Sequence, residues 1–115
     1  MKAGEVFWVD LPARGGHAQL GRRPAIVLQT CEASSVLPTV LLIPLTTQLD
    51  ALRFPGTLLV EPDPENGVKR PSVALVFQLA AIDRRFIGSR AGQVSTETVG
   101  QIWQSLDELT GRMSS

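Results

Sequence analysis

The densest concentration of reactive side chains is a glycine-rich polar segment between two apolar runs. It is Gly15-Gly16-His17-Ala18-Gln19-Leu20-Gly21-Arg22-Arg23-Pro24, and it holds the only histidine of the chain. Glycine lets a backbone approach a ligand closely, and two adjacent guanidinium groups can donate paired hydrogen bonds to phosphate. The segment therefore indicates a phosphate-binding loop. A surface loop with solvated arginines is the alternative, because most loops of this composition are of that kind.

A second polar cluster follows a continuous apolar run. Thr39–Leu45 is short enough for a buried strand, and it ends in Thr46-Thr47-Gln48. Hydroxyl and amide groups at the mouth of a buried strand can hydrogen-bond a ligand. Thr46 could equally cap a short helical turn over Gln48–Leu52. Gln78 is a further candidate, because a polar residue inside an apolar run needs a partner if it is buried.

The composition indicates one globular domain, residues 1–115. The chain is 43% apolar and 19% charged, which suffices for one core and excludes a disordered chain. No apolar run approaches the ~20 residues that span a membrane, and no signal peptide is expected. The lone Cys31 predicts a cytoplasmic protein without disulfides, with this residue as a buried or half-buried filler. No His/Cys cluster has metal-ligand spacing, so neither a metal nor another cofactor is expected.

The net charge and its distribution limit the class of partner. A formal net charge of zero argues against a protein that coats nucleic acid by bulk electrostatics. Residues 47–66 are mainly acidic, whereas residues 69–90 place five cations against Asp83. These cations are Lys69, Arg70, Arg84, Arg85 and Arg90. A local basic surface on a neutral protein could therefore bind RNA or an acidic peptide.

Short apolar and β-branched runs predict six strands that must position these groups. The first strand is apolar on both faces, with Val6 and Trp8 on one and Phe7 and Val9 on the other. This pattern predicts a central strand or one that lines an interface. The predicted strands are Glu5–Leu11, Pro24–Gln29 (with Ala25–Leu28 as its apolar part), Thr39–Leu45, Thr57–Val60, Ser72–Leu79 and Ile87–Val94.

One strong helix is predicted, over Thr96–Thr110. Ser95 is a good N-cap and Gly111 a stop signal. Residues 31–38 are expected to form a turn and loop, and Asp83–Phe86 a short helical turn. The helix has one apolar face, made of Val99, Ile102, Trp103, Leu106 and Leu109. These elements predict a mainly β (α+β) fold, a small antiparallel barrel with a C-terminal helix.

Four segments in order resemble the MazF/PemK family of toxin endoribonucleases, and the likeness continues through Ala81-Ile82-Asp83 and the terminal helix. The segments are Gly4-Glu5-Val6-Phe7-Trp8-Val9-Asp10, Gly21-Arg22-Arg23-Pro24-Ala25-Ile26-Val27-Leu28, Pro44-Leu45-Thr46-Thr47-Gln48 and Ser72-Val73-Ala74-Leu75-Val76-Phe77-Gln78. The resemblance implies an SH3-like barrel of the CcdB/PemK type that forms a two-fold homodimer. It also implies metal-independent, sequence-specific cleavage of single-stranded RNA, and a cognate antitoxin whose acidic tail lies across the RNA groove.

The resemblance places catalysis on the arginine before the proline, Arg23, and on the first threonine of the Thr-x-Gln segment, Thr46. Cleavage of RNA without metal uses the neighbouring 2′-hydroxyl as nucleophile, so the enzyme must move protons and stabilise charge on the phosphorane. Arg23 can donate two hydrogen bonds to phosphate oxygens and Thr46 a third. The candidates for contacting the rest of the RNA are Arg14, His17, Gln19, Arg22, Thr47, Gln48 and Gln78.

Position 18 departs from the family pattern. Many members have Gly-x-Glu-Gln-x-Gly before the Arg-Pro, and Ala18 stands where that glutamate falls. General acid–base catalysis contributes about 10²–10⁴-fold, so the hypothesis is a weakened or inactive nuclease. Natural divergence, with His17 taking over proton transfer, is one explanation. A deliberate substitution that allowed a toxic protein to be produced is the other, and the retained Gln19 and Gly21 favour it.

Two other functions compete with RNA cleavage. One is a CcdB-like toxin that binds gyrase on the same barrel without cutting anything. The other is a catalytically dead paralogue that only binds antitoxin. The Arg23-Pro24 and Thr46-x-Gln48 pairings favour the nuclease, since a gyrase-binding toxin has no need of a phosphate grip there, whereas Ala18 favours the paralogue.

Overall fold

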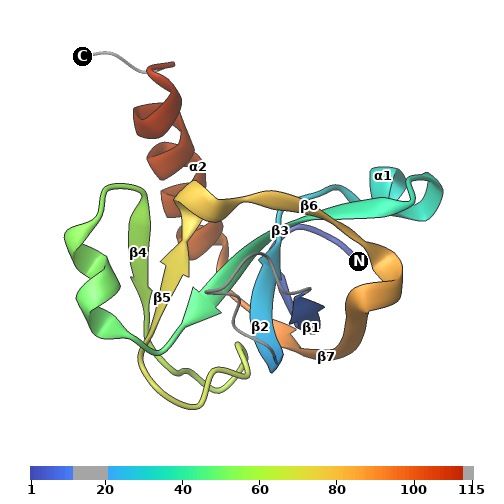
Figure 1. Cartoon of the computed structure of the whole chain (residues 1–115), viewed down its shortest axis with the longest axis horizontal. Coiled ribbons are helices and arrows are strands. Elements are labelled where there is room, and N and C mark those ends of the chain that lie inside the picture. Colours follow the sequence, from blue (N-terminus) through green and yellow to red (C-terminus); the bar gives the residue numbers. More distant parts are fainter. Residues whose placement is uncertain (12–20, 113–115) are drawn as a thin grey trace.

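Every pair of strands in the sheet is antiparallel (Figure 1). The computed structural model describes residues 1–11 and 21–112. Its seven-stranded sheet has the order β4-β5-β3-β2-β1-β7, and β6 pairs with β3 beside β5. The strands are β1 (Glu5–Leu11), β2 (Gly21–Val27), β3 (Thr39–Thr46), β4 (Thr57–Val60), β5 (Ser72–Leu75), β6 (Ala80–Asp83) and β7 (Ile87–Gln93).

Two α-helices and three short 3₁₀ turns connect or flank the strands. They are α1 (Cys31–Val36), η2 (Leu49–Arg53), η3 (Val76–Gln78), η4 (Arg84–Phe86) and α2 (Thr96–Thr110). The mainly antiparallel β fold with one C-terminal helix is confirmed, although the pairings of the described strands leave the sheet unclosed. Among the described helices, none is long and apolar enough to cross a membrane.

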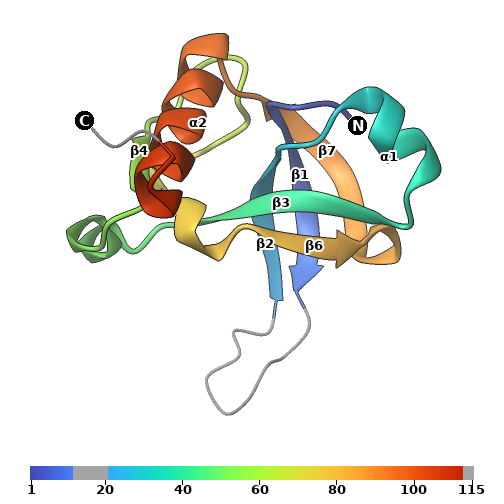
Figure 2. The same cartoon turned by 90° about the horizontal axis from the view of Figure 1, so that it is seen from above.

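Both faces of the central strands are buried. On β1, Val6 belongs to one core cluster and Val9 to another, as the alternation of apolar residues predicted. The first cluster lies under α2 and includes Ile26, Ile43 and Ile102, and the second packs against β6 and η4. Figure 2 shows β3 and β6 running across β1 and β2, so the sheet is strongly twisted.

Helix α2 has the predicted bounds because its caps are local signals. The Ser95 hydroxyl accepts a hydrogen bond from the Thr98 N–H at 3.1 Å, and Gly111 ends the helix with φ 75°. Ile102 is fully buried and Val99 packs against the same core. Trp103 was predicted to share this face, but it lies a quarter-turn further round the helix and is exposed.

Three sequence-based predictions of local structure are wrong. Residues 31–36 form α1 rather than a loop, since the Thr30 hydroxyl accepts from the Ala33 N–H and caps it. Cys31, expected to be at least half-buried, is exposed on the first turn of this helix. The expected strand Ser72–Leu79 is interrupted by η3, because β5 and β6 pair with different parts of β3 and the chain must step between them.

Glu5 connects three parts of the chain. Its carboxylate accepts a hydrogen bond from Arg90 of β7 at 2.7 Å and from the Lys2 N–H at 2.8 Å, and it lies 4.0 Å from the terminal amino group. Burial acts to raise the pKa of this carboxyl, but the hydrogen bonds and positive charges outweigh it and hold the pKa below its usual value. The carboxylate therefore stabilises the fold in its ionised form.

Replacing Glu5 by Gln should lower the free energy of unfolding by about 1–2 kcal/mol at pH 7, since a charge-assisted hydrogen bond is lost. A folded-state pKa below the unfolded one contributes stability above the unfolded pKa, and this is lost as the pH falls through the folded pKa. The difference between wild type and variant should therefore be smaller at pH ~3 than at pH 7. Urea unfolding at both pH values measures it. Asp50→Asn, at an exposed ion pair with Arg53, is the matched control and should change little.

Candidate active site

The candidate site lies at the end of β3 where its pairing with β2 stops. β2 and β3 pair through Ala25–Pro44, Ile26–Ile43 and Val27–Leu42, and their pairing ends at the first of these. Pro24, which would oppose Leu45 if the register continued, has no N–H to donate, and this explains why the ladder stops there. On its other edge, β3 still pairs with β5 at this point, through Leu45–Ala74 and Thr46–Val73.

The register of β2 and β3 relates Arg23 to Thr46. Continuing it two residues past Ala25–Pro44 aligns these two residues. Side chains two residues apart on a strand share a face, so Arg23 lies on the face of Ala25 and Thr46 on that of Pro44. Both residues are half-buried. A guanidinium and a hydroxyl thus follow the last pair of the ladder on the same face of the two strands.

The hydroxyl of Thr46 is oriented by its own backbone. Its Oγ1 accepts a hydrogen bond from the Gln48 N–H at 3.2 Å, a local turn that precedes η2. The expected helical turn is present over Leu49–Arg53, but Gln48 occupies its N-cap and makes no side-chain capping bond. Because the acceptor side of the hydroxyl is used by the backbone, its proton remains available to donate to an anion.

Arg22 lies on the opposite face of β2 from Arg23. Its Cζ lies 6.0 Å from the Trp8 ring centroid, and its Nη2 donates to Ser89 Oγ of β7 at 3.5 Å. A Cβ at Gly88 would lie 3.1 Å from the same nitrogen, so the absence of a side chain there leaves room for the guanidinium. The structure therefore separates the two arginines that the sequence places side by side, and only Arg23 faces Thr46.

The remaining predicted contact residues fall into two groups. Thr47, Gln48 and Gln78 are exposed, and η3, which holds Gln78, packs against β3. Gln78 was expected within a strand and is instead on a 3₁₀ turn with its side chain in solvent. The others lie outside the described residues, in the segment that joins Leu11 to Gly21, two residues before Arg23. These are Arg14, His17, Ala18 and Gln19.

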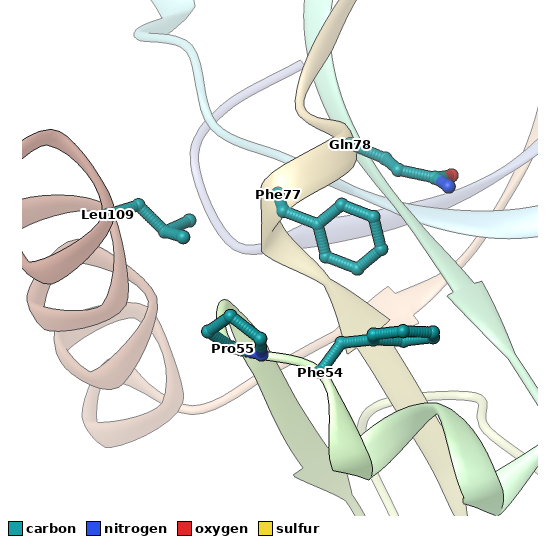
Figure 3. Close-up of a pocket in the computed structure, with 5 residues that line it drawn as sticks. All are labelled: Phe54, Pro55, Phe77, Gln78 and Leu109. Atoms are coloured by element: carbon teal, nitrogen blue, oxygen red, sulfur yellow. The ribbon is translucent and has the colours of Figure 1, made fainter.

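A separate apolar hollow of about 490 Å³ is lined by Phe54, Pro55, Phe77, Gln78 and Leu109 (Figure 3). The rings of Phe54 and Phe77 meet edge to face with centroids 6.1 Å apart. Arg53 lies over the Phe54 ring at 4.5 Å. Sequence reasoning missed this feature, because it assigned Phe77 to a buried strand and Phe54 to a turn.

The described part of the chain offers hydrogen-bond donors rather than metal ligands. Across residues 1–11 and 21–112, no group of three His, Cys, Asp or Glu side chains is placed to hold a metal ion. Arg23 and Thr46 supply donors that can converge on one anion, with amides and hydroxyls nearby. Such an arrangement can bind a phosphodiester and stabilise negative charge that develops on it.

A family model for PemK-like, MazF-like toxins of type II toxin–antitoxin systems matches residues 2–110. The chain belongs to this family. It is 31% identical to the endoribonuclease toxin MazF of Escherichia coli K12 over 94% of this chain and 92% of that protein. It is 28% identical to the endoribonuclease EndoA of Bacillus subtilis over 92% of this chain and 90% of that protein.

Solved structures agree on the fold of this MazF-like chain. MazF from Deinococcus radiodurans superposes with a TM-score of 0.79 at 23% identity, covering 96% of both chains. A MazE–MazF structure from the same organism gives a TM-score of 0.76 at 25% identity, covering 99% of this chain and 97% of that one. The resemblance found in the sequence segments is therefore confirmed at the level of family and fold.

Proposed function

We propose that this chain is the toxin of a type II toxin–antitoxin pair and cleaves single-stranded RNA at specific short sequences without a metal ion. The observation that carries the proposal is the register of β2 and β3, which aligns Arg23 with Thr46 when it is continued two residues beyond Ala25–Pro44. Membership of the PemK/MazF family supports it, as do relatives named endoribonucleases. The same matches favour RNA cleavage over the gyrase-binding alternative.

The reaction assigned to this site is an attack within the RNA strand. The 2′-hydroxyl loses its proton and its oxygen bonds to the adjacent phosphorus, while the bond from phosphorus to the 5′-oxygen breaks and that oxygen takes up a proton from water. The products are a 2′,3′-cyclic phosphate and a 5′-hydroxyl. Arg23 holds the non-bridging oxygens with two hydrogen bonds and Thr46 donates a third, so the developing charge is neutralised. Thr47, Gln48 and Gln78 are proposed to contact unpaired bases or the backbone.

The cations of the site also suit an acidic antitoxin. The matched structures of MazF include one with MazE from Deinococcus radiodurans and an endoribonuclease with its cognate antitoxin from a mycobacterial species. By extension, we propose that a cognate antitoxin places an acidic segment over Arg23 and Thr46. Occupation of the same donors by carboxylates would exclude the RNA phosphate.

A homodimer is the assembly we propose. Phe54, Phe77 and Leu109 are 45%, 43% and 39% exposed although they are large and apolar, and they converge on one hollow. Apolar patches of this kind commonly mark interfaces, and a second copy presenting the same patch would cover it across a two-fold axis. Of the apolar residues on β1, Val6 and Val9 are buried in the core of the chain itself.

Replacing Arg23 by Ala should lower kcat/KM for RNA cleavage by about 10²–10³-fold, since a donor to the developing charge is removed. Arg22→Ala is the matched control: it removes the same charge one residue away but on the opposite face, and it should cost less than tenfold. Cleavage of a long single-stranded RNA in EDTA, with product ends mapped, measures both. Equal losses for the two variants, or products lacking 2′,3′-cyclic phosphate, would contradict the assignment.

Restoring the family glutamate by Ala18→Glu should raise the rate of cleavage by about 10²-fold or more, because a proton-transfer group is supplied. Ala18→Gln is the matched control, since it has a similar size without a titratable group. Multiple-turnover rates between pH 5 and 9 should show an added ionisation only in the Glu variant. If all three proteins cut RNA equally fast, the glutamate is dispensable. If the Glu variant remains inactive but binds antitoxin, the antitoxin-binding paralogue is the better description.

Placing a charge in the apolar hollow by Phe77→Glu should convert the dimer to a monomer, because a carboxylate would be buried against apolar side chains. Sedimentation velocity measures the mass, and circular dichroism verifies the fold. Val36→Glu, on an exposed residue of α1, is the matched control and should remain dimeric. A monomeric wild type, or a Phe77→Glu variant with undiminished dimerisation, would refute the assembly proposed here.

A further inference from the structure

We propose that Lys69 and Arg70 form a second phosphate-binding element, on the side of Thr46 opposite to Arg23. It would hold the backbone of the RNA beyond the cleaved bond. This inference rests on the proposed function, since it names further contacts with the same substrate. Neither residue was among those singled out for RNA contact from the sequence, where they contributed only to a local excess of positive charge.

The sheet topology brings this pair to the same end of the strands as the candidate site. β3 lies between β2 and β5 in the sheet, and both neighbours run antiparallel to it. The start of β2, the end of β3 and the start of β5 therefore lie at the same end of these strands, the lower end in Figure 1. Thr46 pairs with Val73, the second residue of β5, so Arg70 lies three residues before the partner of Thr46.

Arg70-Pro71 repeats the arrangement of Arg23-Pro24. Each arginine precedes a proline near the beginning of a strand that flanks β3, and proline restricts the residue before it to extended backbone. At Arg70 the backbone is also held by Ser72, a buried residue whose Oγ donates to the Arg70 carbonyl at 2.9 Å. The direction in which the Arg70 side chain leaves the strand is thereby limited.

The backbone is fixed on the other side of the pair as well. Val68 is buried in the core under α2, and its N–H donates to Asn66 Oδ1 at 2.9 Å. Asn66 is itself buried and donates through Nδ2 to the Glu61 carbonyl at 2.8 Å. Lys69 and Arg70 are thus exposed residues in the short segment between the buried residues Val68 and Ser72, which presents their charges to solvent.

The surrounding charges leave the pair available. In the part of the chain that the structure describes, neither cation forms an ion pair. Among the nearby acids, Asp63 accepts hydrogen bonds from the N–H groups of Glu65 and Asn66, both at 2.8 Å. Glu61 follows Val60, the partner of Ser72, and is the carboxylate that lies nearest in register. Glu65 is the third carboxylate of this loop, and none of the three forms an ion pair with Lys69 or Arg70.

An RNA backbone fits this arrangement better than a compact anion does. Neighbouring strands are about 4.8 Å apart, so cations at the starts of β2 and β5 are separated by roughly two such spacings. A phosphodiester held between Arg23 and Thr46 continues into a chain of further phosphates, and a single strand that leaves over β5 passes Lys69 and Arg70. Such contacts add affinity without sequence preference and make it dependent on salt.

The test measures binding of RNA strands of increasing length, 2′-O-methylated to prevent cleavage and centred on the mapped cleavage sequence. The double variant Lys69→Gln, Arg70→Gln is compared with the control Lys2→Gln, Arg84→Gln. The control removes the same charge at the opposite end of the strands. Lys2 precedes β1, whose first residues pair with the end of β2. Arg84 follows Asp83, which pairs with Thr39 at the start of β3. Circular dichroism and thermal unfolding verify that both variants fold.

We expect the double variant to bind long RNA about tenfold more weakly at low salt, with the slope of log Kd against log salt reduced by about 1. Its affinity for the shortest RNA that is bound, and kcat on the same sequence with free 2′-hydroxyl groups, should match wild type, as should all values for the control. Equal behaviour of the two double variants would overturn the inference. So would unchanged RNA binding with weakened binding of the antitoxin, which would assign the pair to that protein. A wild type that neither binds nor cleaves RNA would overturn the proposed function itself.

Discussion

Pro24 lacks the N–H that a strand donates to its neighbour, and the pairing of β2 with β3 ends beside it, at Ala25–Pro44. This loss of one donor makes a junction at the end of β3. There β3 has no partner in β2 on one edge, whereas on its other edge its last two residues pair with β5. The proposed site of an arginine and a threonine on adjacent strands needs such an opening, because paired neighbours would leave no room for a phosphate between them.

The junction holds its shape because the strands that form it are packed on both faces. Ile26 and Ile43 face the core under α2, whereas Ala25 and Leu42 face the cluster next to β6 and η4. A strand buried on both sides can neither slip nor tilt without exposing one core, since a shift of one residue would exchange its faces. The positions of Arg23 and Thr46 therefore follow from packing several residues away, and preorganisation of this kind is what charge stabilisation requires.

The parts of the structure that could be predicted are those with local signals. Helix α2 begins after Ser95 and ends at Gly111 as expected, because capping depends on a few neighbouring residues. The break at η3 could not be predicted, since Val76 and Phe77 continue an apolar run and only pairing with β3 decides where the strand ends. The placement of Arg22 and Arg23 on opposite faces could have been predicted, because neighbouring residues of a strand point to opposite faces. It was missed because β2 was expected to start at Pro24, which left both arginines in a loop.

The alignment of Arg23 with Thr46 depends on a register that no local pattern in the sequence sets. Only the resemblance to a family assigned catalysis to both residues. Charge explains how such a site works on a neutral protein. Four described arginines are neutralised within the fold, by Asp50, Asp83, Glu5 and Asp107. Within the described ranges, Arg23 and Arg70 have no carboxylate partner, and both lie at the edge where β3 ends. Screening limits attraction between exposed charges to about 10 Å at 0.1 M salt. The proposed attraction of RNA would therefore act locally, where Arg23 and Arg70 lie, rather than over the neutral surface as a whole.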